Sequence, residues 1–381
     1  MRIGIVTFYH ADNYGAVLQA YALQEYLRQA GHLVKIIRYN FDYQPPAGLP
    51  RRFRRWVAER SGRSLLATYL KWQHFRKRSR FRSFREQCLN LSAPYENIDE
   101  LAGSPPDCEV YVCGSDQVWN PDYVSRPNVR RACFLDFGGP SVTRIAYSAS
   151  FGRDALYQSY REQNAPLLRR FFKISVREAS AVPLVHQLTG QEAVCLPDPA
   201  LLLERAAYEK LAVAYPASTR DYVFFYGLSG IPVPELIGLQ RRLRQAGRRQ
   251  ILSPFPLCLP WSDFARSVYP EPRQWLYLIG HAAAVVTNSF HGTLFSILYE
   301  RPFVSLRLCG RMADRNNRMA SLLERVGLVD RLIDARDHDA AVSLLAQPVE
   351  WEAVRTRLAG WVREADLFWR EVFAEAGHAD L

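Results

Sequence analysis

The sequence predicts an α/β protein of two Rossmann-like domains that face each other across a cleft, with a C-terminal helix that packs back across them. Two observations support this prediction. Short apolar runs typical of buried strands alternate with segments of helical periodicity, and the alternation starts a second time near residue 204. With 381 residues, the chain is also longer than one ordinary core requires and suits two domains of moderate size.

The first domain is expected to span residues 1–203. It opens with a strand at RIGIVTFY, a helix over AVLQAYALQEYLRQAGH that Gly31 ends, and a second strand at LVKIIRY. This βαβ order is the unit that builds parallel sheets. Further strands are expected at EVYVCG, TRIAYSAS, KISVRE and AVCLPD, with helices near 160–172 and 179–188.

The second domain is expected to span residues 204–350, and the final helix residues 351–381. Strands are predicted at YVFFYGL, RQILSP, AAVVTNS and PFVSLRL, and helices near 234–246, 273–282 and 292–300. Open α/β sheets bind ligands beyond the carboxyl ends of their strands. We therefore expect the ligand site in the cleft where the two sets of strand ends face each other.

Composition narrows the class of protein. The sequence contains no apolar stretch long enough to span a membrane and opens directly on a strand, so we expect a cytoplasmic protein. Its seven cysteines are scattered and show no CxxC pair, which favours reduced thiols and no metal site. The motifs GxxxxGK[ST], GxGxxG after the first strand, GxSxG and HExxH are also missing.

The net charge of +11 comes from one segment. Between Arg51 and Arg85 the sequence has thirteen Arg or Lys and one acid, Glu59, so the remainder is close to neutral and nucleic acid is not an expected partner. We expect residues 51–87 to form a basic helical insertion rich in aromatic residues. It either packs its aromatics inward or lies through 51–85 on the anionic inner face of a membrane as a peripheral contact.

The strongest local pattern is VVTNSFHGTLFSILYE, a buried strand followed by a polar loop and a helix that begins near Gly292. Unsatisfied N–H groups at a helix start bind anions, and Ser289 and Thr293 add hydroxyl groups there. His291 in this loop is the candidate catalytic residue. The alternative is that Asn288 or Ser289 only caps the helix.

Other strand ends carry further candidates. The loop CGSDQVWNP after EVYV combines an acid, Asp116, with polar groups and an indole that suit a hydroxylated ligand, although Asp116 capping a turn explains it equally well. In SVRE, Arg177 offers a guanidinium for a phosphate or carboxylate, or else pairs with Glu178. The first βα loop adds Asn13 and Tyr14. The candidate acceptor-binding residues are Asn13, Tyr14, Ser115, Gln117, Trp119 and Asn120.

The motifs NYGAVLQAYALQ, CGSDQVWNP, AYSASFG, SVRE, LPDPALLL and NSFHGTLFSI occur in this order over roughly residues 3 to 330. In this, the chain resembles the polysaccharide pyruvyl transferase family. The resemblance implies a fold similar to the GT-B glycosyltransferases and a cytoplasmic role in exopolysaccharide biosynthesis. It also implies transfer of the pyruvate group of phosphoenolpyruvate to two sugar hydroxyls as a ketal, with release of phosphate.

The resemblance also implies roles for single residues. It assigns His291 and Arg177 to the phosphoenolpyruvate donor. Some members of the family carry a further arginine two residues before the histidine, where this chain has Ser289. Either Arg315 or Arg318 supplies the missing cation, or the donor binds in a different pose. The candidate donor-binding residues are Arg177, Ser289, Gly292, Thr293, Arg315 and Arg318.

The residues suit this chemistry. A helix start and arginines match a donor that carries both a phosphate and a carboxylate. Ketal formation adds a proton to the methylene carbon and removes protons from the hydroxyls, which His291 and Asp116 would share. We expect the first domain to bind the carbohydrate acceptor, lipid-linked or not, and the second the donor. The scheme needs no metal and no cofactor besides the co-substrate.

Two other functions stay open on the sequence. A nucleotide-sugar glycosyltransferase would have the same architecture, but it needs a base and ribose pocket that the sequence does not indicate. A non-catalytic carbohydrate- or membrane-binding module is less consistent with a histidine at an anion site.

Overall fold

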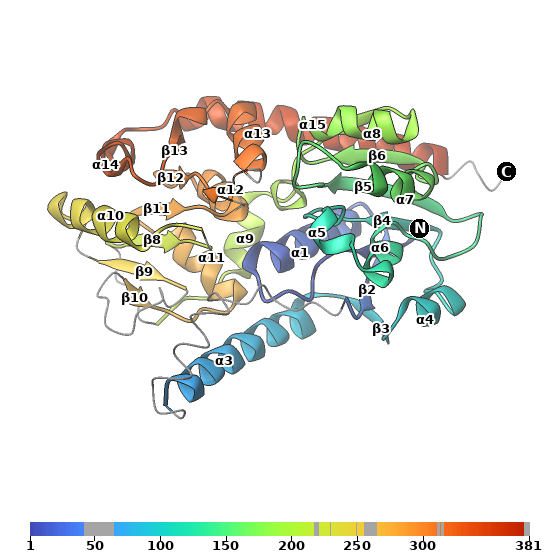
Figure 1. Ribbon diagram of the computed structural model, residues 1–381, viewed down its shortest axis with the longest axis horizontal. Coiled ribbons are helices and arrows are strands. Elements are labelled where there is room, and N and C mark those ends of the chain that lie inside the picture. The colour runs from blue at the N-terminus through green and yellow to red at the C-terminus, as the bar shows by residue number, and fades with distance from the viewer. Residues whose placement is uncertain are drawn as a thin grey trace.

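The computed structural model describes residues 1–41, 65–216, 221–228, 230–248, 250–254, 265–310, 313 and 316–376, with side chains in 65–88 described from Lys77 onward. Each of two parallel sheets is flanked by helices, and the two lie end to end in the longest direction of the molecule (Figure 1). The predicted fold class is therefore confirmed.

The first sheet has seven parallel strands in the order β3-β2-β1-β4-β5-β6-β7. They are β1 (Arg2–Val6), β2 (Leu33–Tyr39), β3 (Leu91–Tyr95), β4 (Val110–Cys113), β5 (Thr143–Ala149), β6 (Lys173–Val176) and β7 (Ala193–Cys195). The order reverses between β1 and β4, which is the position where such sheets bind ligands. The sequence did not predict β3, because this edge strand contains a proline and few apolar residues.

The second sheet repeats this order with six parallel strands, β10-β9-β8-β11-β12-β13. They are β8 (Val223–Tyr226), β9 (Ile251–Ser253), β10 (Arg266–Ser267), β11 (Ala284–Thr287), β12 (Phe303–Leu306) and β13 (Leu332–Ile333). Here the reversal falls between β8 and β11. The strands β10 and β13 were not predicted either, because two residues are too few to show a hydrophobic period.

Helices connect the strands. Those before the second sheet are α1 (Tyr14–Gln29), α3 (Leu65–Cys88), α4 (Ile98–Gly103), α5 (Pro121–Val124), α6 (Pro127–Cys133), α7 (Gln158–Leu168), α8 (Ala181–Thr189) and α9 (Arg205–Leu211), with the short η1 (Pro199–Leu201). Those that follow are α10 (Val233–Gln245), α11 (Pro272–Gly280), α12 (Phe290–Leu298), α13 (Asn316–Val326), α14 (His338–Ala346) and α15 (Trp351–Ala376), with η3 (Val329–Arg331).

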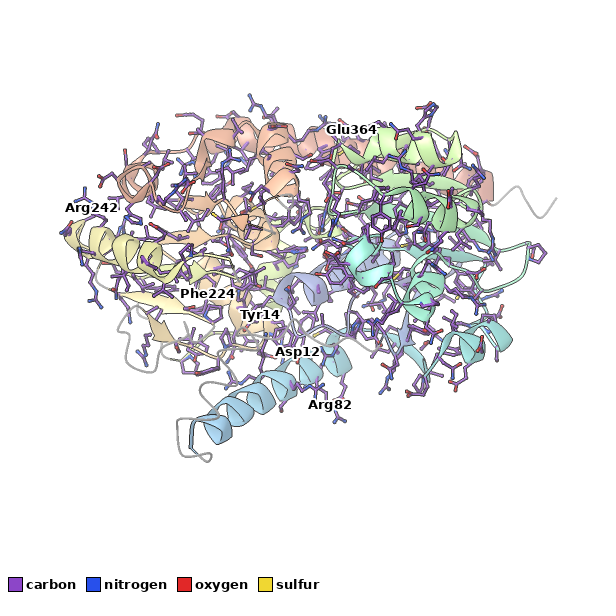
Figure 2. All side chains as sticks on the ribbon, in the orientation of Figure 1. Asp12, Tyr14, Arg82, Phe224, Arg242 and Glu364 are labelled. Carbon is purple, nitrogen blue, oxygen red and sulfur yellow. The ribbon has the colours of Figure 1, made fainter. Side chains whose placement is uncertain are left out.

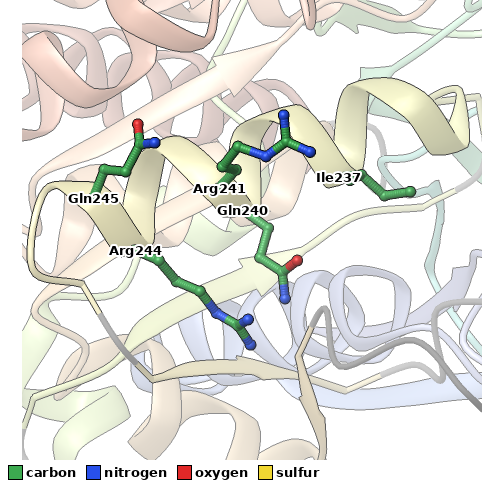
Figure 3. A pocket seen from close by; sticks show the side chains of 5 residues that line it. All are labelled: Ile237, Gln240, Arg241, Arg244 and Gln245. Carbon is green, nitrogen blue, oxygen red and sulfur yellow. The ribbon is translucent and has the colours of Figure 1, made fainter.

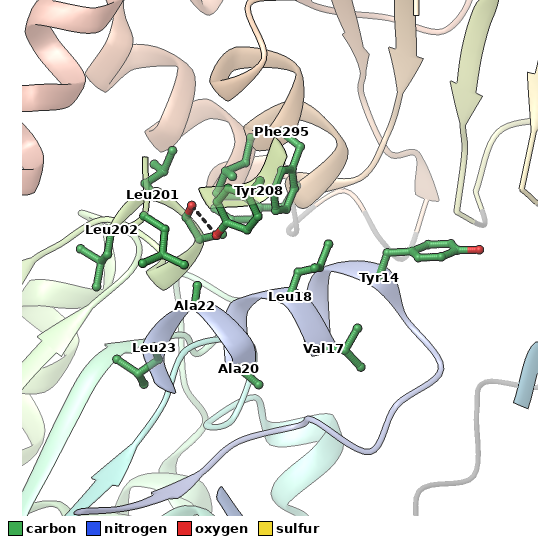
Figure 4. Close-up of a cluster of buried hydrophobic side chains, with 14 of the residues drawn as sticks. Tyr14, Val17, Leu18, Ala20, Ala22, Leu23, Leu201, Leu202, Tyr208 and Phe295 are labelled. Carbon is green, nitrogen blue, oxygen red and sulfur yellow. Dashed lines mark hydrogen bonds between the residues drawn. The ribbon is translucent and has the colours of Figure 1, made fainter. Parts of the chain in front are cut away.

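The two domains share a hydrophobic core. Helix α1 of the first domain packs against α11 and α12 of the second and against η1, and α9 packs against α11 (Figure 4). Tyr14 stacks on Trp275 with ring centroids 5.2 Å apart, and its hydroxyl donates to the carbonyl of Pro270 at 2.9 Å. The cleft is thus closed along this side of the interface.

The C-terminal helix α15 returns from the second domain to the first, as predicted. Its Trp361 Nε1 donates to the carbonyl of Cys195 at 3.1 Å, and Trp369 stacks on Tyr147 in the first sheet. At the other domain, Glu364 pairs with Arg325 of α13 (Figure 2). These contacts span both domains, so α15 ties them together.

Helix α3 contains the described part of the basic insertion. Phe81 and Phe84 are fully buried, with Phe81 against Tyr14 and Phe84 against Tyr21 of α1. Arg82 faces outward (Figure 2). In this half of the insertion, aromatics therefore pack inward, Arg78 and Arg82 are exposed, and Arg85 turns inward to pair with Asp12 at 3.1 Å. Residues 51–64 and the side chains of 65–76 lie outside the described residues. None of the described helices combines the length and apolarity that crossing a membrane requires.

Candidate active site

Six side chains meet where the two domains touch, and we call them the active-site cluster: Ser115, Asp116, Arg177, Glu178, Asp198 and His291. The first five follow the carboxyl ends of β4, β6 and β7, and His291 lies in the first turn of α12 after β11. Parallel strands and a closed cleft bring these ends together from positions far apart in the chain.

Asp198 lies at the centre of the cluster and was not predicted, although its motif LPDPALLL was noted. Its Oδ2 accepts hydrogen bonds from Ser115 Oγ at 2.8 Å and from Arg177 Nη1 at 3.0 Å, and it lies 3.4 Å from His291 Nε2. The available signal was an acid placed directly after a strand and between two prolines. That signal could not show which residues the carboxylate would contact.

Arg177 is buried among three carboxylates. Its Nε lies 3.3 Å from Glu178, Nη1 bonds Asp198, and Nη2 lies 3.7 Å from Asp116, while the ring of Phe290 covers the guanidinium at 4.4 Å. Burial would lower the pKa of Arg177, but Glu178, Asp198 and Asp116 outweigh it and raise that pKa. Nη2 is buried and makes no hydrogen bond, so it is the guanidinium nitrogen that still has donor capacity for a further acceptor.

Glu178, the predicted ion-pair partner of Arg177, also accepts a hydrogen bond from a second residue. Its Oε1 accepts a hydrogen bond from Ser150 Oγ at 2.7 Å, and Ser150 Oγ in turn accepts one from the Gly152 N–H. Glu178 thereby fixes the loop after β5 to the arginine. The expected ion pair and a role in the site are both present at this position.

His291 lies with its imidazole between the two domains and is 6 % exposed. Nε2 is directed at Asp198, and the Nδ1–Cγ bond of the ring lies against Gly15 at the start of α1. A Cβ at Gly15 would overlap Nδ1 and Cγ and lie 2.7 Å from Cβ of His291. Only glycine therefore leaves room for this imidazole, which explains the NYG motif in physical terms.

Asp116 has a left-handed backbone, with φ of 79°. Its carbonyl accepts from Ser150 N, and its Oδ1 accepts from Gln117 N at 2.8 Å, so neighbouring bonds hold the strained residue in place. Its carboxylate reaches the cluster through Arg177. The turn-forming interpretation of Asp116 thus has a structural basis, and its catalytic role remains a prediction.

The structure corrects the predicted acceptor role of Trp119. The indole is fully buried, stacks on Phe134, packs against Phe151 and donates from Nε1 to the carbonyl of Cys133. It belongs to the core of the first domain and is not positioned to stack on a ligand. An aromatic residue after a strand looks the same in sequence whether it faces a cleft or a core.

Gln117 and Asn120 also serve the loop itself. Asn120 Nδ2 donates to Gln117 Oε1 at 2.7 Å, and Asn120 Oδ1 accepts from Asp122 N at the start of α5. Asn13 caps α1 through Ala16 N. These side-chain bonds give all three groups a local structural role, and their direct binding of an acceptor remains a prediction.

Tyr14 and Ser115 are likewise occupied. Tyr14 is 2 % exposed and donates to Pro270 across the domain interface, so it acts as an interdomain contact. Ser115 is buried and donates to Asp198. Both hydroxyls thus support the packing of the site, and acceptor binding by Tyr14 and Ser115 remains a prediction.

The predicted donor residues at the start of α12, Ser289, Gly292 and Thr293, also make structural contacts within the domain. Ser289 caps the helix through a long 3.4 Å bond from Gly292 N, as the alternative interpretation expected. Thr293 is buried, and its Oγ1 donates to the Ser289 carbonyl and contacts Ser305 Oγ, so it has a structural role, and donor binding by it remains a prediction. A Cβ on Gly292 would overlap Thr287 Oγ1 and lie 2.9 Å from the Tyr226 ring, so the packing at this position requires glycine. Donor binding by Gly292 remains a prediction.

Of the two arginines proposed as the missing cation, Arg315 and Arg318, the structure describes Arg318. Arg315 lies outside the described residues. Arg318 is half-buried in the first turn of α13, next to Met319, whose sulfur contacts Thr293 Oγ1 at 3.8 Å. This places Arg318 on a helix that packs against α12, and its donor role remains a prediction.

Two surface hollows lie apart from the cluster. One is lined by α10 residues, including Ile237, Arg241 and Arg244 (Figure 3), and the other includes Arg242 and His338. Neither α10 nor α14 contributes to the active-site cluster. Within the described ranges, no group of three or more His, Cys, Asp and Glu side chains could hold a metal ion.

Two Rossmann-like domains closed over a buried acid, arginine and histidine cluster define a protein of the GT-B-like class. The family model described as "Polysaccharide pyruvyl transferase" matches residues 13–309. The chain belongs to the polysaccharide pyruvyl transferase family. No curated protein matches its sequence.

Similarity to solved structures extends over nearly the whole chain. The S. aureus MnaA structure with UDP is 10% identical, with a TM-score of 0.53 over 94% of this chain and 91% of that one. Methanocaldococcus jannaschii UDP-GlcNAc 2-epimerase with UDP-GlcNAc and UDP is 12% identical, with a TM-score of 0.48 over 91% and 93%. Spinosyn rhamnosyltransferase SpnG is 14% identical, with a TM-score of 0.47 over 96% of each chain. Of these three, the MnaA structure has the highest TM-score, and at 10% identity it shows a shared fold and nothing about activity.

Proposed function

We propose that this protein transfers the pyruvate group of phosphoenolpyruvate to a sugar of a cell-surface polysaccharide or its precursor, as a ketal. The observation that carries the proposal is the convergence of Arg177 and His291 on one carboxylate. Arg177 Nη1 lies 3.0 Å and His291 Nε2 3.4 Å from Asp198 Oδ2. These are the two residues that the family resemblance assigns to the donor, and they come from different domains.

The proposed reaction balances as follows. Two sugar hydroxyl oxygens each form a bond to C2 of the donor, and the bond from C2 to the phosphate oxygen breaks. The hydroxyls lose two protons, of which one is added at C3 to make the methyl group and the other leaves with phosphate. An acid must therefore protonate C3 and a base must accept hydroxyl protons, and His291 is the side chain in the cluster suited to both near neutral pH.

Charge in the cluster bears on donor binding. Three carboxylates surround one arginine, so a phosphate and a carboxylate enter a site that is already rich in negative charge. Protonation of His291 on donor binding would offset this charge and ready the acid at the same step. A cation from outside the cluster, such as Arg315 or Arg318, would act in the same direction.

The proposal is tested by incubating the purified protein with phosphoenolpyruvate and a panel of glycosides. We expect release of phosphate that depends on a glycoside, and a product whose mass increases by one pyruvate minus water. The same panel with nucleotide sugars tests the glycosyltransferase alternative. Release of nucleoside diphosphate without any phosphate from phosphoenolpyruvate would overturn the proposal.

Arg177→Lys is expected to lower kcat/KM for phosphoenolpyruvate by about 10-fold or more. A lysine ammonium retains the charge but cannot bond Glu178 and Asp198 while also presenting a third nitrogen to the ligand. Thermal unfolding of the variant separates lost binding from lost fold. A folded variant with parental kinetics would show that Arg177 is only structural.

A peripheral membrane contact through 51–85 is part of the proposal, because a polysaccharide precursor can be lipid-linked. The described half of α3 turns Phe81 and Phe84 inward and leaves Arg78 and Arg82 exposed, so this half would contribute charge to the contact and no inserted aromatic ring. We expect co-sedimentation with anionic vesicles at low salt, its loss at high salt, and none with zwitterionic vesicles. Binding that is equal on both vesicle types would contradict an electrostatic contact.

A further inference from the structure

The turn that carries Asp198 is held rigidly. A proline stands on each side of the residue, and its Oδ1 accepts from the N–H of Ala200 at 3.0 Å. Two buried hydroxyls fix the flanking backbone: Tyr147 donates to the carbonyl of Pro197 at 3.1 Å, and Tyr208 to that of Ala200 at 2.9 Å (Figure 4). One carboxylate oxygen is thus used to anchor the side chain, which leaves Oδ2 with a fixed direction.

The second carboxylate oxygen, Oδ2, is directed at the domain interface. Ser115 and Arg177 reach Oδ2 from the first domain, and His291 reaches it from the second. The carboxylate is 1 % exposed, so water does not compete for these contacts. Asp198 is therefore a fixed acceptor against which the imidazole is placed when the domains are closed.

Asp198 is charged in this setting. Burial alone would raise the pKa of its carboxyl, but His291 and Arg177, together with the Ala200 N–H, outweigh burial and hold that pKa well below its usual value. An ionised carboxylate only accepts hydrogen bonds. The neighbouring hydroxyls stay neutral, because burial raises the pKa of Tyr147 and of Tyr208 well above its ordinary value.

The two imidazole nitrogens of His291 face different surroundings. Nε2 is enclosed by protein and lies 3.4 Å from Asp198, slightly longer than a full N–H···O bond. Such bonds often shorten when a substrate complex forms. Gly15 packs against the Nδ1–Cγ bond, and Nδ1, unlike Nε2, is not one of the fully buried atoms without a partner.

We infer that Asp198 is a positioning residue that accepts the Nε2–H of His291 across the domain interface, so that Nδ1 is the nitrogen that exchanges protons with the substrates. The identity of those substrates rests on the proposed function. In this arrangement the neutral ring holds its proton on Nε2, takes a hydroxyl proton at Nδ1, and gives the proton from Nδ1 to the methylene carbon. Asp198 stabilises the imidazolium present between these two transfers.

The tautomer of His291 tests the inference without any turnover. The unmodified protein is labelled with ¹⁵N-histidine, and the His291 ring signals are identified by their loss in His291→Gln. At a pH where the ring is neutral, we expect the proton on Nε2. A neutral ring that carries its proton on Nδ1, or that is an even mixture of both forms, would overturn the inference.

Asp198→Asn tests it further. An amide can turn its NH₂ toward the ring, so the Nε2–H form is no longer enforced, and we expect kcat to fall by about 10²-fold or more. The limb of the pH–rate profile set by His291 should move to lower pH, because the carboxylate that stabilises the imidazolium is gone. An unchanged tautomer with an unchanged pH profile would show that Asp198 is merely structural.

Glu178→Gln is the matched control, because Glu178 is also a buried carboxylate bonded to Arg177 but contacts Ser150 in place of His291. We expect it to alter KM for phosphoenolpyruvate while the His291 ring keeps its proton on Nε2. If it changes the tautomer as Asp198→Asn does, the effect passes through Arg177 and the inference falls. The protein could also release no phosphate from phosphoenolpyruvate while the Nε2–H form of His291 still depends on Asp198. That result would overturn the proposed donor and would still support the positioning role of Asp198.

Discussion

His291→Gln is expected to slow phosphate release by about 10²-fold or more, the scale on which general acids and bases contribute. Glutamine can occupy a similar position at the start of α12 and can donate a hydrogen bond to an anion, but it cannot carry a proton at neutral pH. The substitution therefore separates binding of the donor from proton transfer. Single-turnover phosphate release at saturating phosphoenolpyruvate measures the chemical step.

His291→Ala accompanies this variant and removes both functions. We expect it to lose rate at least as severely as His291→Gln and to raise KM for the donor as well. The fold should survive in both, because the bonds of Ser289 and Thr293 at the start of α12 do not involve the imidazole. A His291→Gln protein that works at near the parental rate with an unchanged pH profile would reduce His291 to a phosphate ligand.

Gly15→Ala is expected to cost about as much activity as the loss of His291, although the substitution adds a single methyl group. The new Cβ would overlap the imidazole and come within 2.7 Å of Cβ of His291, which is closer than a rotation of the ring alone can relieve. Displacing a catalytic group by about 1 Å can cost on the order of 10²-fold in rate. Steady-state kinetics of phosphate release measures this loss.

The backbone itself does not oppose the change at Gly15. The residue lies in the first turn of α1, where alanine is favoured over glycine by up to about 1 kcal/mol. Gly103→Ala, at the end of α4, is the matched control because its Cβ would meet no heavy atom within 4 Å. Parental activity in Gly103→Ala and loss in Gly15→Ala is the expected result, and equal activity in the two would show that His291 needs no fixed place against α1.

Local patterns were sufficient for most of the fold. Alternating apolar runs and helical periods identified β1, α1 and β2, most other long strands, and the helix from Trp351 to Ala376. They did not identify β3, α13 or α14. The edge strand β3 contains a proline and is defined by its pairing with β2, which is not visible within a short window. The apolar spacing of Met319, Leu322, Leu323 and Val326 in α13 was present in the sequence and was overlooked.

The candidate site shows the same division. His291, Arg177 and Asp116 were found because a histidine, an arginine or an acid directly after a buried strand is locally unusual, and the structure places them in one cluster. Trp119 was misassigned, because burial against Phe134 depends on a helix that follows later in the chain. Asp198 was missed for the converse reason, since its partners lie 21 positions away at Arg177 and 83 at Ser115.

Hydrophobic period, turn residues and motif order decided the class of fold, the two sheets and the family, because each depends on neighbours along the chain. The closed packing of the two domains decided the rest: which groups surround Arg177, which nitrogen of His291 faces Asp198, and why residue 15 is glycine. Those relations join residues from opposite domains. They depend on distances of a few ångströms that arise only once both sheets are folded and brought together, so the order of residues in the chain does not reveal them.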